Sequence, residues 1–284
     1  MRNWILAIRP KTLIAGISPV ILGTLAAPEK NLWIFLATLC FALSIQIGTN
    51  LANDYYDFFK GADTPQRKGP LRVTQAGIFS PKKVKFAFLT FFSLAFLIAS
   101  FFFQRGGIFI PTMLSFSLFF GLAYTAGPIP LGYIGMGDLL VFLFFGPLAS
   151  MGSYYLQMGT LELFPFLIGI GPGLISTALL AVNNTRDVKE DQKAGKKTLV
   201  VRFGEKFGKG EYFFLMTAST LLPLFFLGVF PISFLILLLL TSNSLALGRQ
   251  FWKETNPYKM NAFLASTTNF LWIYTFIFSL LLWH

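Results

Sequence analysis

Acidic side chains that could bind a cation stand directly after one of the most apolar runs of the chain. The run LWIFLATLCFALSIQIGTNLA leads into NDYYDFFKGADT, although the whole chain holds only 12 Asp and Glu residues. Asp54 and Asp57 are three positions apart, so on a continuing helix they lie on one face. Asn50 stands one helical turn before Asp54, whereas Asp63 follows Gly61 and is expected in a loop.

The same arrangement occurs a second time in the segment AVNNTRDVKEDQKAGKKTL. Asp187 and Asp191 are four positions apart, which again places them on one helix face, and Asn183 stands one turn before Asp187. Both segments therefore read Asn-x-x-x-Asp with a further Asp one turn later. We interpret this as the trace of an internal duplication of a four-helix unit.

Carboxylates that share a helix face repel one another and tend to take up protons, and a bound cation removes this conflict. Carboxylate and amide oxygens are ligands that suit Mg²⁺, which commonly keeps positions for water or for a substrate phosphate. Two facing motifs would therefore hold two metal ions with a diphosphate between them. Solvated acids at helix ends are the alternative for either motif alone, but two matched motifs argue against it.

Basic side chains adjoin both acidic motifs, in TPQRKGPLRVTQAG and in QKAGKKTLVVRFG. Lys and Arg bind phosphate oxygens, so acids and bases together predict an anionic, metal-bridged ligand. The predicted diphosphate-binding residues are Asn53, Lys60, Arg67, Lys68, Arg72, Arg186, Lys196, Lys197 and Arg202.

The elements that must position these residues are membrane-spanning helices. Of the 284 residues, 55% are hydrophobic and 12% are charged, and the apolar residues form continuous runs of about 20, the length of a helix that crosses a bilayer. The sequence predicts an all-α integral membrane protein with the lipid bilayer as its surroundings. The nine expected spans are approximately 13–28, 32–57, 83–104, 108–126, 137–157, 162–184, 211–229, 231–249 and 261–283.

The net charge of +11 could indicate a nucleic-acid partner, but the distribution of the charge indicates membrane topology instead. With nine spans, 21 of the 23 Lys and Arg fall on the face that holds the N-terminus, which the positive-inside rule places in the cytoplasm. We therefore expect one transmembrane domain over residues 1–284 in a bacterial cytoplasmic (inner) membrane, with its C-terminus on the opposite face. The motif loops, about 58–82 and 185–210, would be cytoplasmic. The single Cys40 excludes an intramolecular disulfide.

The two acidic motifs resemble those of the UbiA superfamily of intramembrane prenyltransferases, which carries N-D-x-x-D in its second helix and D-x-x-x-D in its sixth helix. Longer segments are similar to the branch of that superfamily that prenylates 1,4-dihydroxy-2-naphthoate in menaquinone synthesis. These segments are RPKTL, GTNLANDYYDFFKGADT, GPLRVTQAG, AYTAGPIPLGYIGMGDLLVFLFFG, YYLQ and NNTRDVKEDQKAGKKTL. Many superfamily members have a third Asp where Gly61 stands, so the metal role of Asp63 is open.

The resemblance implies a nine-helix fold and Mg²⁺-dependent transfer of a polyprenyl group to the naphthoate, with loss of CO₂ and diphosphate. In this reading, the four Asp residues of the motifs bind two Mg²⁺ and assist the departure of diphosphate. Asn50 and Asn183 ligate the metal or orient its ligands. The candidate acceptor contacts are Arg9, Lys11, Tyr124, Tyr133 and Asp138. The alternative is that the two Tyr residues serve placement at the membrane border and that Arg9 and Lys11 set topology.

Two other functions fit parts of the pattern. A related enzyme could use another aromatic acceptor, such as 4-hydroxybenzoate, because the residues of the acceptor pocket are not visible in the sequence. A divalent-cation transporter would be expected to hold its carboxylates near the middle of the membrane, on broken helices. The acids stand instead at one membrane border beside many cations, which disfavours transport. Prenyl chain length and protein partners stay open.

Overall fold

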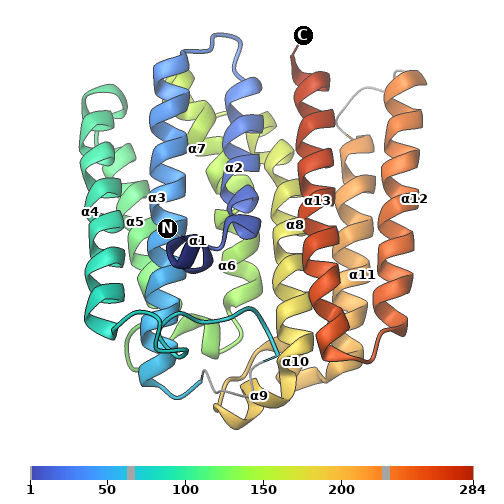
Figure 1. Ribbon diagram of the computed structural model, residues 1–284. Coiled ribbons are helices and arrows are strands. Elements are labelled where there is room, and N and C mark those ends of the chain that lie inside the picture. The colour runs from blue at the N-terminus through green and yellow to red at the C-terminus, as the bar shows by residue number, and fades with distance from the viewer. Residues whose placement is uncertain (1, 63–67, 226–230, 284) are drawn as a thin grey trace.

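The computed structural model describes residues 2–62, 68–225 and 231–283, and all regular secondary structure in these ranges is helical (Figure 1). The all-α prediction is therefore confirmed for the described chain. The helices are α1 (Arg2–Ile8), α2 (Pro10–Leu25), α3 (Leu32–Phe59), α4 (Pro81–Gly106), α5 (Phe109–Ala123), η1 (Leu131–Tyr133), α6 (Gly137–Phe144), α7 (Pro147–Met158), α8 (Leu163–Arg186), α9 (Val188–Lys193), α10 (Leu199–Phe203), α11 (Glu205–Leu221), η2 (Leu222–Phe225), α12 (Pro231–Lys253) and α13 (Pro257–Leu282).

Every expected span overlaps a helix of the structure. Within the described residues, five helical segments are long and apolar enough to cross a membrane, and α2 and most of α5 form two shorter apolar helices. The five are α3, α4, α6 together with α7, α8 and α13. The chain is thus a multi-pass helical membrane protein, while the count of nine spans stays a prediction.

The fifth expected span is two helices rather than one. α6 and α7 are separated at Gly146, and Pro147 starts α7 as the first helical residue, where its missing N–H is no loss. A Cβ atom on Gly146 would lie only 2.6 Å from the Gly169 carbonyl oxygen and 2.6 Å from the Gly173 Cα atom. The break therefore lies where the backbones of two segments meet without side chains between them.

The helices pack in the order of the chain. α2, α3, α4 and α5 are successive neighbours, and so are α7, α8, α11 and α12. α13 packs against α2 and α8 and so joins the two series. This order is the one that a duplicated four-helix unit with an appended helix requires, although the duplication itself stays a prediction.

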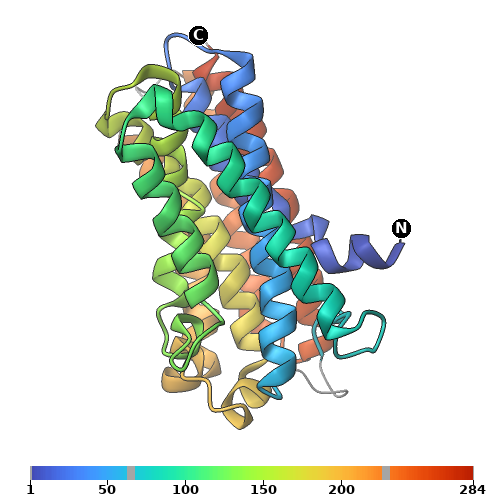
Figure 2. The same cartoon turned by 90° about the vertical axis from the view of Figure 1, so that its left-hand side faces the viewer.

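Both acidic motifs lie at one end of the bundle, which we call the motif end. Figures 1 and 2 show the C-terminal ends of α3 and α8 there, together with α9, α10 and the segment that leads into α4. The C-terminus lies at the opposite end, and α1 projects sideways from the bundle (Figure 2). The prediction that four intervening spans return the second motif to the side of the first agrees with this arrangement.

Candidate active site

The first motif is positioned by α3, which stays helical through Phe59, so Asp54 and Asp57 share a face as predicted. Asp54 is only 2% exposed. Its two carboxylate oxygens accept hydrogen bonds from the backbone N–H groups of Val73 and Thr74, each at 3.0 Å. Asp54 therefore ties the segment 68–80 to the end of α3.

Asp57 is buried beside side chains from two other segments. Its Oδ1 atom accepts a hydrogen bond of 2.9 Å from the Tyr133 hydroxyl, and its Oδ2 atom lies 3.9 Å from Arg72 Nη2. The ammonium groups of Lys60 and Lys196 each lie 5.0 Å from the centroid of the Tyr133 ring, within cation–π range. Tyr133 thus brings acidic and basic residues of both motifs to one place.

The second motif is not one continuous helix, contrary to the sequence prediction. α8 ends at Arg186, α9 begins at Val188, and Asp187 forms the junction with φ −96° and ψ 9°. The Asp191 N–H still donates to the Asp187 carbonyl at 2.8 Å, so one turn is retained across the junction. Asp187 thus lies between the two helices and Asp191 lies within α9, although the two residues remain one turn apart.

Each carboxylate of the second motif has a basic partner. Arg186, which is 1% exposed, donates from Nε and Nη2 to the two oxygens of Asp187 at 2.7 and 2.6 Å. Lys196 Nζ lies 3.0 Å from Asp191 Oδ1. Because Lys196 also lies over Tyr133, the contacts run without interruption from Asp57 through Tyr133 and Lys196 to Asp191.

A residue of the last helix joins this network, and the sequence analysis did not identify it. Asn261 Oδ1 accepts a hydrogen bond of 2.9 Å from Arg186 Nη1, and its Nδ2 group donates to the Lys68 carbonyl at 3.0 Å. Lys68 Nζ in turn lies 3.0 Å from Glu190 Oε1. No sequence pattern in α13 identifies Asn261, because its contacts depend on which residues of other segments lie beside the start of α13.

A cavity of about 570 Å³ opens from the motif end into the bundle. Most of its lining is apolar and comes from α2, α3, α5, α6, α7 and α8. The residues that line it near the motif end are Arg9, Asn50, Asn53, Tyr124 and Asn183. The cavity therefore has a polar end beside the acidic motifs and an apolar interior.

The polar end is held by the start of the chain. Arg9 has φ 58° and ψ 65°, the left-handed region that non-glycine residues seldom adopt. Its Nη2 atom donates to the Asn50 carbonyl at 3.4 Å, while Asn50 Nδ2 donates to the Ile8 carbonyl at 3.1 Å. Strained backbone of this kind occurs preferentially at functional sites. Asn183 Nδ2 donates within its own helix, to the Leu179 carbonyl at 3.1 Å.

Lys60, one of the predicted diphosphate-binding residues, lies beside the acidic motifs and has backbone partners in another segment. Lys60 Nζ donates to the carbonyls of Thr125 and Gly127 at 2.8 and 3.2 Å. Partial burial lowers the pKa of Lys60; Asp57 opposes that effect, and the charge of Lys196 adds to it. Lys60 thus supports the α5–α6 connection and remains near the acidic motifs.

The remaining predicted residues have separate positions. Arg202 donates hydrogen bonds to the carbonyls of Lys197 and Ile134 at 3.0 and 2.7 Å. It therefore connects α10 to the segment before α6. Lys11 is exposed. Asp138 is buried, does not line the cavity, and its Oδ1 atom has no hydrogen-bond partner within the described residues.

Two predicted residues, Asp63 and Arg67, lie outside the described residues.

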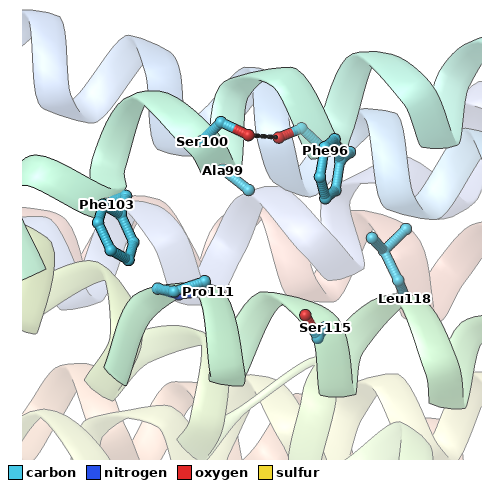
Figure 3. A pocket seen from close by; sticks show the side chains of 7 residues that line it. All are labelled: Phe96, Ala99, Ser100, Phe103, Pro111, Ser115 and Leu118. Carbon is cyan, nitrogen blue, oxygen red and sulfur yellow. Dashed lines mark hydrogen bonds between the residues drawn. The ribbon is translucent and has the colours of Figure 1, made fainter. Parts of the chain in front are cut away.

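A second, smaller pocket of about 290 Å³ lies between α4 and α5 (Figure 3). Pro111, Ser115 and Leu118 of α5 line it, whereas the α5 residues of the large cavity project from the opposite side of the helix. Its Ser100 hydroxyl donates a hydrogen bond of 2.9 Å to the Phe96 carbonyl. No residue of either acidic motif lines this pocket, which distinguishes it from the large cavity at the motif end.

The donor atoms of the motifs suit a hard divalent cation. All of them are carboxylate or amide oxygens, the ligand type that Mg²⁺ prefers. Asn53, the residue before Asp54, has a buried Oδ1 atom without a hydrogen-bond partner in the described chain, so this oxygen is available to a ligand. In the described ranges no three Asp, Glu, His or Cys side chains are grouped closely enough to hold a metal ion by themselves. The residues therefore fit a metal ion that is bound by the protein and by oxygen atoms of the substrate together.

Such a site suits a substrate with an anionic end and an apolar tail, which defines the protein as an enzyme of the membrane interior. The chain belongs to the UbiA prenyltransferase family, whose model matches residues 16–281. It is 36% identical over 240 residues to the 1,4-dihydroxy-2-naphthoate octaprenyltransferase of Haemophilus influenzae, covering 80% of this chain and 77% of that protein. It is 39% identical over 219 residues to the Escherichia coli enzyme of the same name, covering 71% and 68%.

A solved structure shares the fold. A UbiA homolog from Archaeoglobus fulgidus, bound to GPP and Mg²⁺, superposes with a TM-score of 0.68 over 97% of this chain and 99% of that one, at 16% identity. At this identity the similarity concerns the fold alone. The predicted UbiA-like helical fold is therefore confirmed, whereas the count of nine spans stays a prediction.

Proposed function

We propose that the protein transfers a polyprenyl group from polyprenyl diphosphate to 1,4-dihydroxy-2-naphthoate, with release of CO₂ and diphosphate, to form demethylmenaquinone in its reduced, quinol form. One observation carries this proposal: a largely apolar cavity of about 570 Å³ opens at its polar end beside two acidic motifs. The contacts that join these motifs run from Asp57 through Tyr133 and Lys196 to Asp191. The names of the two bacterial relatives at 36% and 39% identity support the same acceptor.

The diphosphate of the donor would bind at the motif end. Arg72 and Lys196 now pair with acids of the motifs, so they are placed to pair with phosphate oxygens when a metal takes their positions on the carboxylates. The buried Arg186 would stay on Asp187 and add its positive charge from there. This exchange keeps the buried charges paired throughout, because a buried charge without a partner is strongly unfavourable. Lys60, Lys68 and Lys197 would add to the positive potential there, with Arg202 on the outer side of the network.

Two Mg²⁺ ions are proposed, one at each motif. Asp54, Asp57, Asp187 and Asp191 would hold them, and Asn53 Oδ1, which has no partner in the described chain, would add a neutral oxygen. Asn50 and Asn183 line the same end of the cavity and would orient the ligands. Bound Mg²⁺ would supply Lewis-acid stabilisation of the charge that develops on the leaving diphosphate.

The chain itself shelters the reacting groups. Breaking the allylic C–O bond would leave a carbocation in the cavity, where apolar walls exclude the water that would capture it. The naphthoate carbon that bears the carboxylate would form the new C–C bond, and loss of CO₂ would return an electron pair to the ring. Arg9 and Tyr124 line the same cavity end and are placed to bind the acceptor. The positions of Lys11 and Asp138 outside the lining make them weaker candidates.

The protein would operate in a bacterial cytoplasmic membrane with the motif end facing the cytoplasm. The uneven distribution of Lys and Arg supports this orientation, since 21 of 23 fall on that face. Residues 1–284 would then act as one transmembrane domain, with the water-soluble ends of both substrates entering from the cytoplasmic side.

The test is product formation by the purified protein in detergent. Farnesyl diphosphate, Mg²⁺ and 1,4-dihydroxy-2-naphthoate are supplied, and mass spectrometry follows the prenylated product and CO₂; 4-hydroxybenzoate is the parallel acceptor. We expect product from the naphthoate only, and its loss with EDTA and in Asp187→Ala. Product from the benzoate alone would retain the enzyme class and overturn the acceptor. Folded protein that forms neither product, with short or long donors, would overturn the proposed function.

A further inference from the structure

Asn261 connects three parts of the motif end, although it stands far from both motifs in sequence. It lies in the second turn of α13, half-buried beside the fully buried Met260. Its oxygen accepts from Arg186 at 2.9 Å, and its nitrogen donates to the Lys68 carbonyl at 3.0 Å and to the Tyr258 carbonyl at 3.2 Å. Both ends of its amide are therefore used.

The contact with Arg186 is informative because this guanidinium is almost completely buried. Asp187 accepts two of its N–H groups, and Asn261 accepts a third. The planar fork of an arginine is oriented by the set of acceptors around it, so removing one acceptor permits the group to turn. Asp187 lies at the junction of α8 and α9, and both of its side-chain oxygens accept hydrogen bonds from Arg186. Its orientation thus depends strongly on Arg186.

We propose that Asn261 is a positioning residue for the metal site of the second motif, acting through Arg186 on Asp187. This inference rests on the proposed function, because it assumes that Asp187 binds metal. Each carboxylate oxygen can accept more than one interaction, so Arg186 can orient Asp187 while a lone pair remains for a cation. Partners one step behind a metal ligand commonly change metal affinity by 10- to 100-fold when they are replaced.

The same residue joins the two motif segments. Its bond to the Lys68 carbonyl reaches the segment after the first motif, and Lys68 Nζ pairs with Glu190 of α9 at 3.0 Å. The position of the segment that begins at Lys68 and the orientation of Asp187 thereby both depend on one side chain. A residue that merely packed α13 against α8 would not produce such a coupling.

The test measures Mn²⁺ binding to the purified protein in the presence of inorganic diphosphate by the EPR signal of free Mn²⁺, with a protein-free blank, and requires no turnover. The variants are Asn261→Leu, which keeps the volume and removes all three side-chain hydrogen bonds, and Asn261→Gln, which retains the amide. Asn269→Leu is the matched control, because Asn269 is an exposed residue of the same helix. Melting temperature and monodispersity are measured for each variant, so that misfolded protein is excluded from the comparison.

We expect Asn261→Leu to weaken Mn²⁺ binding about tenfold. Asn261→Gln should recover part of this loss, and Asn269→Leu should match wild type. Arg186→Lys should weaken binding similarly, and the double variant Asn261→Leu/Arg186→Lys should lose no more than Arg186→Lys alone. Unchanged binding in folded Asn261→Leu, or fully additive losses, would overturn this inference and leave the proposed function intact. Wild-type protein that binds no Mn²⁺ would overturn the proposed metal site itself, and this inference with it.

Discussion

The carboxylate of Asp54 is predicted to hold the segment 68–80 closed, in addition to its proposed metal role. Replacing it by Asn keeps the size and one oxygen but removes the charge. The second oxygen becomes an NH₂ group, which cannot accept from a backbone N–H. One of the two 3.0 Å hydrogen bonds from Val73 and Thr74 is therefore lost. In its place, the new NH₂ group faces a backbone N–H group, and both are donors.

The size of this effect follows from the contacts. A hydrogen bond to a charged group contributes about 1.5–3 kcal/mol, and a buried donor left without a partner costs about 1–3 kcal/mol. For one lost bond and one weakened bond we expect a loss of roughly 2–4 kcal/mol in the free energy of opening this segment. Since 1.4 kcal/mol corresponds to a factor of ten, the segment should open about 30 to 1,000 times more often.

Hydrogen exchange followed by mass spectrometry measures this opening directly, because backbone amides exchange through local unfolding. Peptides that cover residues 70–80 should exchange faster in Asp54→Asn by about the factor given above. Asp191→Asn is the control variant. It removes the same charge from the same end of the bundle, but Asp191 pairs with Lys196, and this ion pair does not involve Val73 or Thr74.

Equal exchange of this peptide in wild type and Asp54→Asn would refute the reasoning. So would an equal acceleration in Asp191→Asn, because the effect would then come from the loss of charge at the motif end and not from the two hydrogen bonds. Peptides from α13 serve as an internal reference in both variants.

Three further outcomes are expected. Tyr133→Phe removes the 2.9 Å hydrogen bond to Asp57 but keeps the ring, so kcat/KM should fall about tenfold with little change in melting temperature; unchanged kinetics would exclude a role for the hydroxyl. Gly146→Ala should lower the melting temperature strongly, because its Cβ atom would lie 2.6 Å from backbone atoms of α8. The control Gly210→Ala places a Cβ atom at an ordinary 3.7 Å contact and should be neutral or stabilising. Equal changes in melting temperature for the two variants would contradict the close approach at Gly146. Gly152→Val narrows the cavity at a distance from the motif end, so steady-state rates should fall more for long prenyl donors than for short ones. An equal fall for all donors would contradict the placement of the prenyl chain in this cavity.

Helical periodicity alone predicted much of the site. A run of apolar residues long enough to cross a bilayer has few alternatives to a helix, because unpaired backbone groups are excluded from lipid. The face shared by Asp54 and Asp57 follows from spacing on such a helix, and the common location of both motifs follows from an even number of intervening crossings. These inferences needed only local geometry and the membrane as solvent, and the structure agrees with them.

Where periodicity was extended across residue 187, the helix is interrupted although one backbone turn is kept, and the reason for the interruption is tertiary. Asp187 lies at a helix junction beside a buried Arg186, whose third acceptor, Asn261, comes from the last helix. The separation of α6 from α7 likewise occurs where Gly146 meets the backbone of α8. Sequence spacing describes neighbours along one helix and contains no information about which residue of another helix arrives beside them.

The amino-acid sequence by itself therefore determined the class of fold, the identity of the acidic and basic residues, and the end of the bundle at which they gather. Tertiary structure alone decided which base pairs with which acid, that Tyr133 joins the two motifs, and that Asn261 closes the network. The physical reason is that hydrogen bonds and ion pairs act over about 3 Å, whereas a helical pattern fixes positions only along its own axis.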